Sequence, residues 1–307
     1  MKYQTSVRTD ARKLRTVGKQ SWRLLLFLLV AVALTTPGVL RGQADNQPVT
    51  PFKIAEHLFY VGGSDVTALL VTTPQGLLLL DTGSAENAPQ IVQNVRSLGF
   101  SPTEIKYILV SHGHYDHVGG LARLKRLTGA KVVASDAEVA LLQKGGRGDF
   151  NFGDKLSYEP VTVDRAVHDG DKVELGNLKL TAHLTAGHTK GCTSWTTTAL
   201  IDGRTENVVF LCSVTVPRGY KLVDNPQYPT ISADYRRSFN VLASLPCDVL
   251  LGTHGSFFEL SEKIAALKAS AHQNPFVNPA ECSASIESSR RQFEAEYLRQ
   301  LKEPPGK

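Results

Sequence analysis

Three histidines and one aspartate lie within six positions of the sequence, in the segment SHGHYDHVGG that runs from residue 111 to residue 120. His112 and His114 are two residues apart, so in an extended segment their imidazoles project to the same side and can bind one cation. Asp116 and His117 follow after a turn, and their position suits a second cation close to the first. Two neighbouring cations are the arrangement of a two-metal hydrolase.

Two further histidines follow apolar segments that we expect to be strands. His188 lies in the sequence AGHTKG and His254 in the sequence LGTHG, and the adjacent glycines let the backbone approach a metal closely. With the first group they supply five histidines and one aspartate, which is three ligands for each of two cations. We expect the other histidines of the mature chain to be structural or exposed, although His183 lies near enough to His188 to leave a role in the site open: His57, His168, His183 and His272.

The hydrophobic pattern predicts the elements that position these side chains. Short apolar or alternating runs predict strands at residues 58–61, 68–71, 77–80, 105–110, 131–134, 173–175, 178–183, 194–200 and 207–211. Helical spacing predicts helices at residues 91–98, 121–127, 262–271 and 286–301, with Gly99 ending the first and Ser261 capping the third. The Gly-rich segment 144–160 is expected to be a long loop, and loops of this length are usually functional or disordered.

The first 44 residues have the order of an export signal. A basic region up to Arg23 precedes an apolar run from Leu24 to Leu34, and small residues up to Ala44 form the expected cleavage site. An uncleaved anchor is the alternative, but a membrane span needs roughly 20 apolar residues and this run is shorter. We therefore expect a signal peptide at residues 1–44 and a periplasmic or secreted product without a membrane segment. Residues 45–307, which show neither an internal repeat nor a linker, are expected to form one domain with two sheets at its centre.

The composition is that of a globular protein. Apolar residues make up 42% of the chain and charged residues 21%, which excludes a disordered protein of high charge. Eight of the 34 Lys and Arg residues, but one of the 29 Asp and Glu residues, lie within residues 1–44, which leaves 26 basic and 28 acidic side chains for the rest. The expected mature protein is therefore slightly acidic, and this argues against a nucleic-acid partner.

Four cysteines lie in the expected mature chain, at Cys192, Cys212, Cys247 and Cys282. An even number in an exported protein favours two disulfides, for which three pairings are possible, and four buried free thiols are the alternative. No CxxC pair is present, so a zinc ribbon is disfavoured.

At these residues the sequence resembles the metallo-β-lactamase superfamily, whose motif is His-x-His-x-Asp-His followed by two distant histidines. The resemblance extends from about Phe59 to Pro279 and is closest to the third subclass of class B β-lactamases, subclass B3. It implies an α/β fold, the αββα sandwich of two mixed β-sheets flanked by helices, with two Zn²⁺ per chain at one edge of the sheets. The implied ligands of the first zinc are His112, His114 and His188, and those of the second are Asp116, His117 and His254.

The resemblance also bears on the other residues between the last two histidines. Glyoxalase II and the lactonases of this superfamily carry a bridging aspartate there, whereas the segment from Val208 to Thr215 contains no carboxylate. This argues against a glutathione thioester hydrolase. Another β-lactamase subclass places a cysteine ligand near Cys212, which would change the second site. Pairing of Cys192 with Cys212 and of Cys247 with Cys282, as in some members of the third subclass, is what the resemblance implies.

The activity implied by the resemblance is hydrolysis of β-lactam antibiotics, namely penicillins, cephalosporins and carbapenems. We expect the enzyme to be a monomer. A metal-bound hydroxide, oriented by Asp116, would open the ring without a covalent intermediate. Ser213 and Thr215 would bind the substrate carboxylate, and Asp81, at the end of its strand, would anchor a ligand or its backbone. A related exported lactonase or esterase and a non-catalytic zinc-binding module are the alternatives.

Four aromatic residues have two open interpretations. Phe150 and Phe152 lie on the long loop, and Tyr220 and Tyr228 lie in the segment 217–229. They can cover the apolar side chain of a substrate, or they can pack locally, as apolar loop residues more often do.

Overall fold

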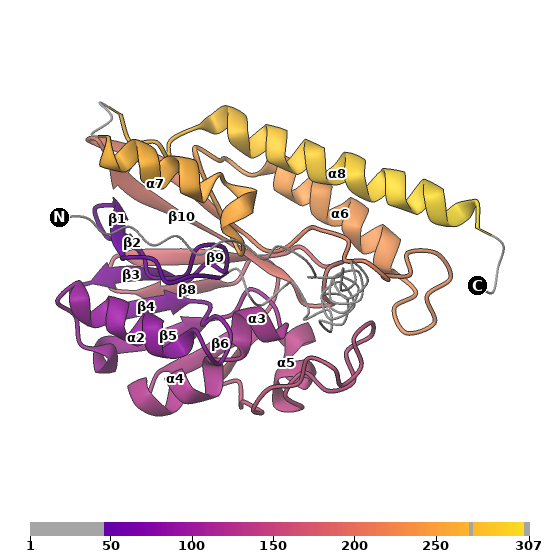
Figure 1. Ribbon diagram of the computed structural model, residues 1–307, viewed down its shortest axis with the longest axis horizontal. Helices are drawn as coiled ribbons and strands as arrows, with labels where there is room; N and C mark the ends of the chain where they lie inside the picture. The colour runs from indigo at the N-terminus through magenta and orange to yellow at the C-terminus, as the bar shows by residue number, and fades with distance from the viewer. Residues whose placement is uncertain (1–45, 270–272, 304–307) are drawn as a thin grey trace, which may run out of the picture. The chain divides into compact units, whose positions relative to one another are not determined.

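The computed structural model describes residues 46–269 and 273–303, and two β-sheets lie at the centre of this part of the chain (Figure 1). The signal peptide expected at residues 1–44 lies outside the described residues. No helix among the described residues is both long enough and apolar enough to cross a membrane.

The first sheet has seven strands, which neighbour one another in chain order. They are β1 (Phe52–Ala55), β2 (Leu58–Tyr60), β3 (Leu69–Thr73), β4 (Gly76–Leu80), β5 (Ile105–Leu109), β6 (Lys131–Ser135) and β7 (Arg165–Val167). The strands from β1 to β4 pair antiparallel, and those from β4 to β7 pair parallel. The parallel half therefore presents the carboxyl ends of four strands at one edge.

The second sheet has five strands in the order β12, β11, β10, β9, β8. They are β12 (Val249–Gly252), β11 (Arg204–Leu211), β10 (Thr193–Ile201), β9 (Leu178–Leu184) and β8 (Lys172–Leu175). β11 and β12 pair parallel, and the other pairs are antiparallel. Both sheets are mixed and helices flank them, so the predicted α/β sandwich is confirmed.

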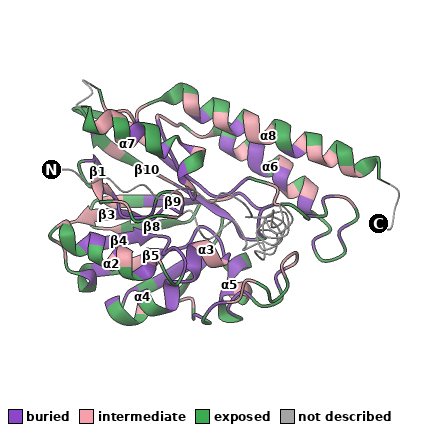
Figure 2. Ribbon diagram, in the orientation of Figure 1, coloured by how far each residue is buried: buried purple, intermediate pink, exposed green. Residues whose placement is uncertain are grey.

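The leucines of β4 show why the first sheet must be covered on both faces. Leu78 and Leu80 pack into the core between the two sheets, whereas Leu77 and Leu79 point to the opposite face. Alternate residues of a strand point to opposite faces, so a continuous apolar run needs partners on both. The partners on the outer face come from α2 (Ala88–Ser97) and α4 (Leu121–Thr128), whose buried side chains lie in the same cluster as Leu77 and Leu79. Figure 2 shows the buried strands between helices with exposed outer surfaces.

The second sheet is covered by α6 (Ile231–Ser244), α7 (Leu260–Lys268) and α8 (Pro279–Leu301), which lie together on the other side (Figure 1). Tyr235 of α6 stacks on Phe293 of α8 and Phe239 packs against the same ring at a tilt, with ring centroids 4.9 and 5.8 Å apart. All three side chains are buried. Burial of large aromatic rings thus fixes the two helices against each other and against the sheet.

Two details of the helices differ from the sequence predictions. α7 begins at Leu260, so the expected cap Ser261 is wrong: Ser261 lies inside the helix, where its hydroxyl donates to the Glu262 carboxylate. The end predicted for this helix, Ala271, lies outside the described residues. The pattern also did not predict five elements of the described part, which are β1, β7, α3 (Tyr115–Val118), α5 (Asp136–Gln143) and α6. Short 3-10 turns occur at η1 (Pro102–Glu104) and η2 (Gly255–Phe257).

All four cysteines are in disulfides, which join Cys192 to Cys212 and Cys247 to Cys282. The first bond joins the chain just before β10 to the end of β11. The second ties the segment before β12 to α8. This is the pairing that the resemblance to the third subclass implies.

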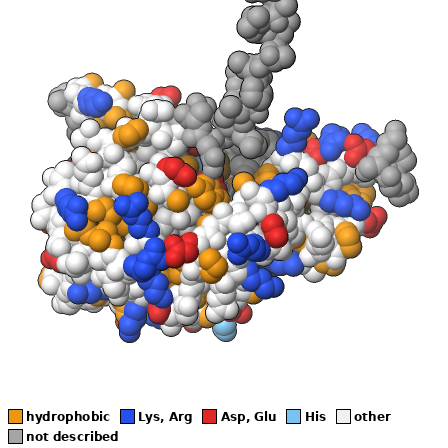
Figure 3. All heavy atoms as spheres, turned by 60° about the horizontal axis from the view of Figure 1, so that its bottom comes forward, with side chains coloured by type: hydrophobic (Ala, Val, Ile, Leu, Met, Phe, Trp, Pro, Cys, Tyr) orange, Lys and Arg blue, Asp and Glu red, His pale blue; other side chains and the backbone are white. Residues whose placement is uncertain are grey.

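The described surface carries charges of both signs. Figure 3 shows Lys and Arg side chains interspersed with Asp, Glu and apolar side chains on the face that lies at the bottom of Figure 1.

Candidate metal centre

The candidate ligands meet at one edge of the two sheets, because the strands that precede them end there. β5 ends at Leu109, shortly before His112, and β12 ends at Gly252, two residues before His254. β9 ends at Leu184 and leads into the loop that carries His188. The chain thus brings together side chains that are far apart in the sequence.

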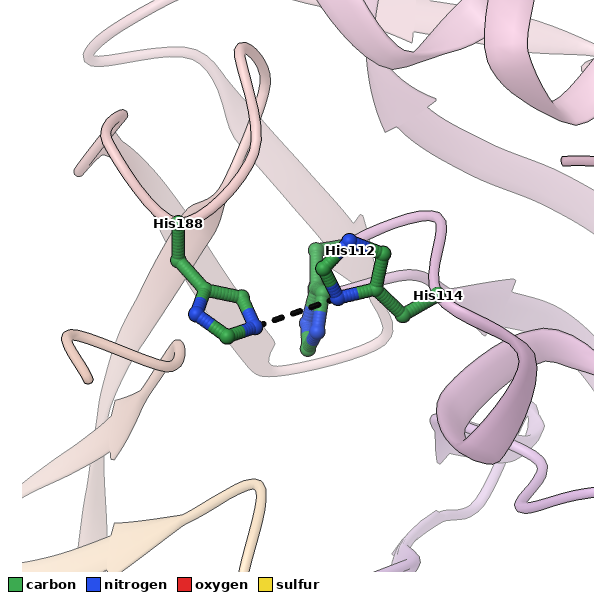
Figure 4. A group of neighbouring side chains, drawn as sticks. All are labelled: His112, His114 and His188. Carbon is green, nitrogen blue, oxygen red and sulfur yellow. Dashed lines mark hydrogen bonds between the residues drawn. The ribbon is translucent and has the colours of Figure 1, made fainter. Parts of the chain in front are cut away.

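The first group consists of His112, His114 and His188, which we call the three-histidine cluster. One nitrogen of each ring lies within 4.8 Å of the others, and all three residues are buried. His114 Nδ1 lies 3.1 Å from His188 Nε2, the contact drawn as a dashed line in Figure 4. The rings meet edge to face, with centroids 4.8 to 4.9 Å apart. Three imidazoles converge here from two separate loops.

Hydrogen bonds fix which nitrogen is free in two of these rings, those of His188 and His112. His188 Nδ1 donates to the carbonyl of Thr215 at 2.9 Å, which leaves the Nε2 lone pair directed at His114. The Ser111 hydroxyl donates to Asp81, so its oxygen is able to accept from His112 Nδ1 at 3.1 Å. The Nε2 atom of His112 is then the unprotonated one. Such fixing of the tautomer is typical of metal-binding histidines.

The second group consists of Asp116, His117 and His254, which we call the aspartate cluster. Asp116 Oδ2 lies 3.2 Å from His117 Nε2 and 3.6 Å from His254 Nε2, and the two imidazole nitrogens are 3.2 Å apart. Behind this cluster, His254 Nδ1 donates to Asp65 Oδ2 at 2.8 Å. The Nε2 lone pair of His254 is therefore directed at Asp116 and His117.

Asp81 lies between the two clusters, at the end of β4. Its carboxylate accepts from the backbone N–H and the hydroxyl of Ser111, at 2.8 and 2.6 Å, and its Oδ2 lies 3.6 Å from His117 Nδ1. Asp81 adopts a φ of 56°, a conformation that aspartate tolerates better than most residues. The structure thus places this residue against the backbone before His112 and against His117, a candidate ligand of the other cluster.

The electrostatics divide the histidines into two kinds. Burial lowers the pKa of His112 and His188 well below the ordinary value, so both rings are neutral, which is the form that binds a metal. Burial also opposes the charge on His117, but the Asp116 and Asp81 carboxylates raise its pKa to about 10. Burial would raise the pKa of Asp116, whereas the neighbouring imidazoles hold it below its usual range. A cation in the aspartate cluster must therefore displace a proton.

The residues present fit two divalent cations. His112 Nε2 is buried and has no hydrogen-bond partner, and buried polar atoms of this kind are rarely left unpaired. Two imidazole lone pairs 3.1 Å apart repel each other unless a proton or a cation lies between them. The rings of His112 and His117 are 4.3 Å apart between centroids, so the two clusters adjoin. Imidazole and carboxylate ligands are those that zinc and similar divalent metals accept.

The structure decides the question about Cys212 and places the two predicted substrate-binding hydroxyls. Cys212 Sγ lies 3.7 Å from His112 Nδ1, but it is bonded to Cys192 and so is not a thiolate ligand.

The hydroxyl of Ser213 is buried and pairs with Thr253 Oγ1 at 2.8 Å. Thr215 is exposed beside His188 and borders a cavity of ≈ 550 Å³. The carboxylate-binding roles of Ser213 and Thr215 remain predictions.

The segment 144–160 is a series of turns without helix or strand, as predicted, and it reaches the centre. The Phe152 ring lies 5.3 Å from that of His114 between centroids. Phe150 packs edge to face against Tyr220 and Tyr228, which are both buried. The two tyrosines therefore form a local apolar cluster with Phe150, and Tyr220 also donates to the carbonyl of His188 at 2.8 Å.

Besides Asp149 of the long loop, whose Oδ2 lies 3.6 Å from His114 Nε2, two carboxylates of the site were not predicted. Asp65, which supports His254, lies in a Gly-Gly-Ser-Asp turn that the pattern identifies as a connection between strands. Glu138 is buried within α5 and accepts a hydrogen bond from Thr189, the residue next to His188. The spacing of residues in the sequence signals neither contact.

Comparisons with known proteins agree with this geometry. The family model described as the metallo-beta-lactamase superfamily matches residues 61–254. The native FEZ-1 metallo-β-lactamase from Legionella gormanii superimposes with a TM-score of 0.82 at 40% identity, over 84% of this chain and 99% of that one. BJP-1, a subclass B3 metallo-β-lactamase of Bradyrhizobium japonicum, gives a TM-score of 0.79 at 37% identity, over 83% of this chain and 96% of that one.

A curated relative named hydroxyacylglutathione hydrolase, from Bradyrhizobium, is 32% identical over 105 residues, which is 34% of this chain and 33% of the relative. This chain matches only about a third of the length of such curated relatives. The similarity to the β-lactamase structures extends over nearly their whole length.

Proposed function

Because the chain belongs to the metallo-β-lactamase superfamily, we propose that it is an exported di-zinc hydrolase that opens the ring of β-lactam antibiotics, namely penicillins, cephalosporins and carbapenems. One observation carries the proposal: two ligand clusters adjoin in one centre, with the His112 and His117 rings 4.3 Å apart. The similarity to subclass B3 enzymes over nearly their full length supports the choice of substrate.

The mechanism assigns a task to each group of residues. The three-histidine cluster would hold one Zn²⁺ and the aspartate cluster the other. Bound zinc would act as a Lewis acid, which polarises a carbonyl oxygen and lowers the pKa of a bound water to about 7. The carboxylate of Asp116 is 39% exposed, and it would accept a hydrogen bond from an attacking water and orient it. The protein residues need supply no covalent nucleophile.

Three residues around the three-histidine cluster would contact the substrate. Thr215 lies beside His188, and its hydroxyl is available to bind the carboxylate that β-lactams carry. Phe152 lies beside His114 and would cover the apolar side of the ring system. Ser213 would also bind the substrate carboxylate, once its hydroxyl turns away from Thr253.

We assign residues 1–44 to an export signal, and the two disulfides are what an oxidising compartment favours. A monomer suffices for activity, because one chain supplies all six ligands.

The test is turnover by the product purified from the periplasm of a host that expresses the full sequence. Nitrocefin, a penicillin, a carbapenem and a lactone panel are assayed before and after a chelator and zinc readdition. We expect β-lactam hydrolysis that His117→Ala abolishes and that His57→Ala, a change at an exposed histidine outside the clusters, retains. Lactone hydrolysis with inert β-lactams would instead establish a lactonase or esterase. Zinc binding without any turnover would establish a non-catalytic module.

A further inference from the structure

Glu138 is a buried carboxylate that lies between the two loops of the three-histidine cluster. It belongs to the first turns of α5, and only 1% of its surface is exposed. A buried carboxylate destabilises a fold unless hydrogen bonds satisfy it. The partners of Glu138 therefore indicate why the chain keeps a charge-bearing group at this depth.

Both partners lie next to candidate metal ligands. Glu138 Oε1 accepts from the hydroxyl of Thr189, which directly follows His188. The Oε2 atom of the same carboxylate lies against Gly113, between His112 and His114, since a Cβ atom at Gly113 would lie 3.1 Å from it. One side chain thus joins the two segments that supply all three histidines.

Two glycines allow α5 to come this close to both loops. A Cβ atom at Gly113 would lie 3.1 Å from Glu138 Oε2 and 2.9 Å from a methyl of Leu141. A Cβ atom at Gly191 would lie 2.6 Å from both the backbone nitrogen and Cγ of Glu138. Ser135, directly before α5, also binds the loop of His188, because its hydroxyl donates to the carbonyl of Gly191 at 2.6 Å. Both loops are therefore shaped to receive the start of α5.

We propose that Glu138 is a positioning residue for the metal centre, which holds the loop of His112 and His114 and the loop of His188 at the separation that lets three imidazoles bind one cation. It acts through Gly113 and Thr189 and contacts neither the substrate nor the cation. Other contacts hold the side chains of the aspartate cluster, including the hydrogen bond of His254 to Asp65. The effect of Glu138 is therefore confined to the three-histidine cluster. The inference rests on the proposed two-cation centre, but not on the identity of the substrate.

The test measures zinc affinity by competition with a chromophoric chelator, in the full-length expressed product with one cluster disabled at a time. Asp116→Ala leaves the three-histidine cluster, and His188→Ala leaves the aspartate cluster. Glu138→Gln, which keeps the shape of the side chain, is added to each background. We expect it to weaken zinc binding by roughly 10- to 100-fold in the first background, as for other residues that support ligands, and to leave the second unchanged.

The matched control is Asp136→Asn, which changes an exposed carboxylate at the start of the same helix and should alter neither affinity. A second pair of variants tests the same link if Glu138→Gln does not fold. Thr189→Val removes the hydroxyl at nearly constant shape and should weaken the three-histidine cluster, whereas Thr189→Ser keeps the hydroxyl and should retain its affinity. An unchanged three-histidine cluster in Glu138→Gln, equal weakening of both clusters, or equal behaviour of Thr189→Val and Thr189→Ser would overturn the proposal. Because the readout is zinc affinity, failure of β-lactam turnover leaves this test intact.

Discussion

His254 donates a hydrogen bond from Nδ1 to the carboxylate of Asp65 at 2.8 Å, although 189 residues separate the two in the chain. The contact is supported by the backbone, since Thr67 donates to the carbonyl of Thr253 and Gly255 donates to that of Asp65. Ser256 N–H donates to the other carboxylate oxygen of Asp65. The turn after β2 thus sets the orientation of a candidate ligand that follows β12.

We predict that removing the Asp65 carboxylate weakens metal binding at the aspartate cluster. Asp65→Ala frees the His254 ring to rotate and to change its tautomer, and loss of such a support typically reduces metal affinity by roughly 10- to 100-fold. Zinc titration in the His188→Ala background measures this affinity. The exposed Glu259→Gln is the control, and an affinity as high in Asp65→Ala as in that control would contradict the role assigned to Asp65.

The two disulfides are predicted to differ in their effect on the centre. Replacing Cys247 and Cys282 by serine removes a link across 35 residues of chain, which should lower the free energy of unfolding by about 2 to 4 kcal/mol and leave zinc affinity unchanged. Replacing Cys192 and Cys212 should reduce both quantities, because Cys212 lies 3.7 Å from His112 Nδ1. Denaturant unfolding and zinc titration are measured on both double variants. Equal zinc affinities in the two would show that the first disulfide does not position His112.

Glu138 should make the stability of the metal-free protein depend on pH. Burial raises its pKa from 4.5 to about 7, against the opposing hydrogen bond from Thr189. Between these values the unfolded chain releases the proton while the folded chain keeps it, so the contribution of Glu138 to the unfolding free energy falls as pH rises. The fall amounts to about 3 kcal/mol and ends above the folded pKa.

Glu138→Gln cannot titrate, so it isolates this contribution. Urea unfolding of both proteins in the presence of a chelator, at steps from pH 4 to pH 8, gives the difference in their free energies of unfolding. As the pH rises from 4.5 to about 7, the unfolding free energy of Glu138→Gln should increase relative to that of the unsubstituted protein. A difference that stays constant with pH would mean that burial does not perturb Glu138.

The sequence predicts side chains that the structure brings together, because the candidate ligands are concentrated in a few short segments. His112, His114, Asp116 and His117 share one short segment, and His188 and His254 both follow apolar strands beside glycine. The strands of the sheets are predictable for a similar reason, since runs such as Leu77–Leu80 satisfy two packed faces at once. Local pattern is sufficient where residue type and spacing alone determine the structure.

The supporting residues were missed because their role depends on contacts between distant segments. Asp65 has the neighbours of an ordinary turn residue, and its partner is known only once β2 and β12 are brought together. Glu138 lies in α5, where alanines and leucines mix with polar residues without a clear apolar face. α6 was missed although Tyr235 and Phe239 point into the core, because exposed Arg and Asn residues interrupt the pattern.

The most direct test of the central claim is the anomalous scattering of zinc in crystals of the purified protein grown with an excess of Zn²⁺. Two peaks per chain are predicted, one among His112, His114 and His188 and the other among Asp116, His117 and His254. A single peak, or peaks away from these six side chains, would contradict the account of a two-cation centre.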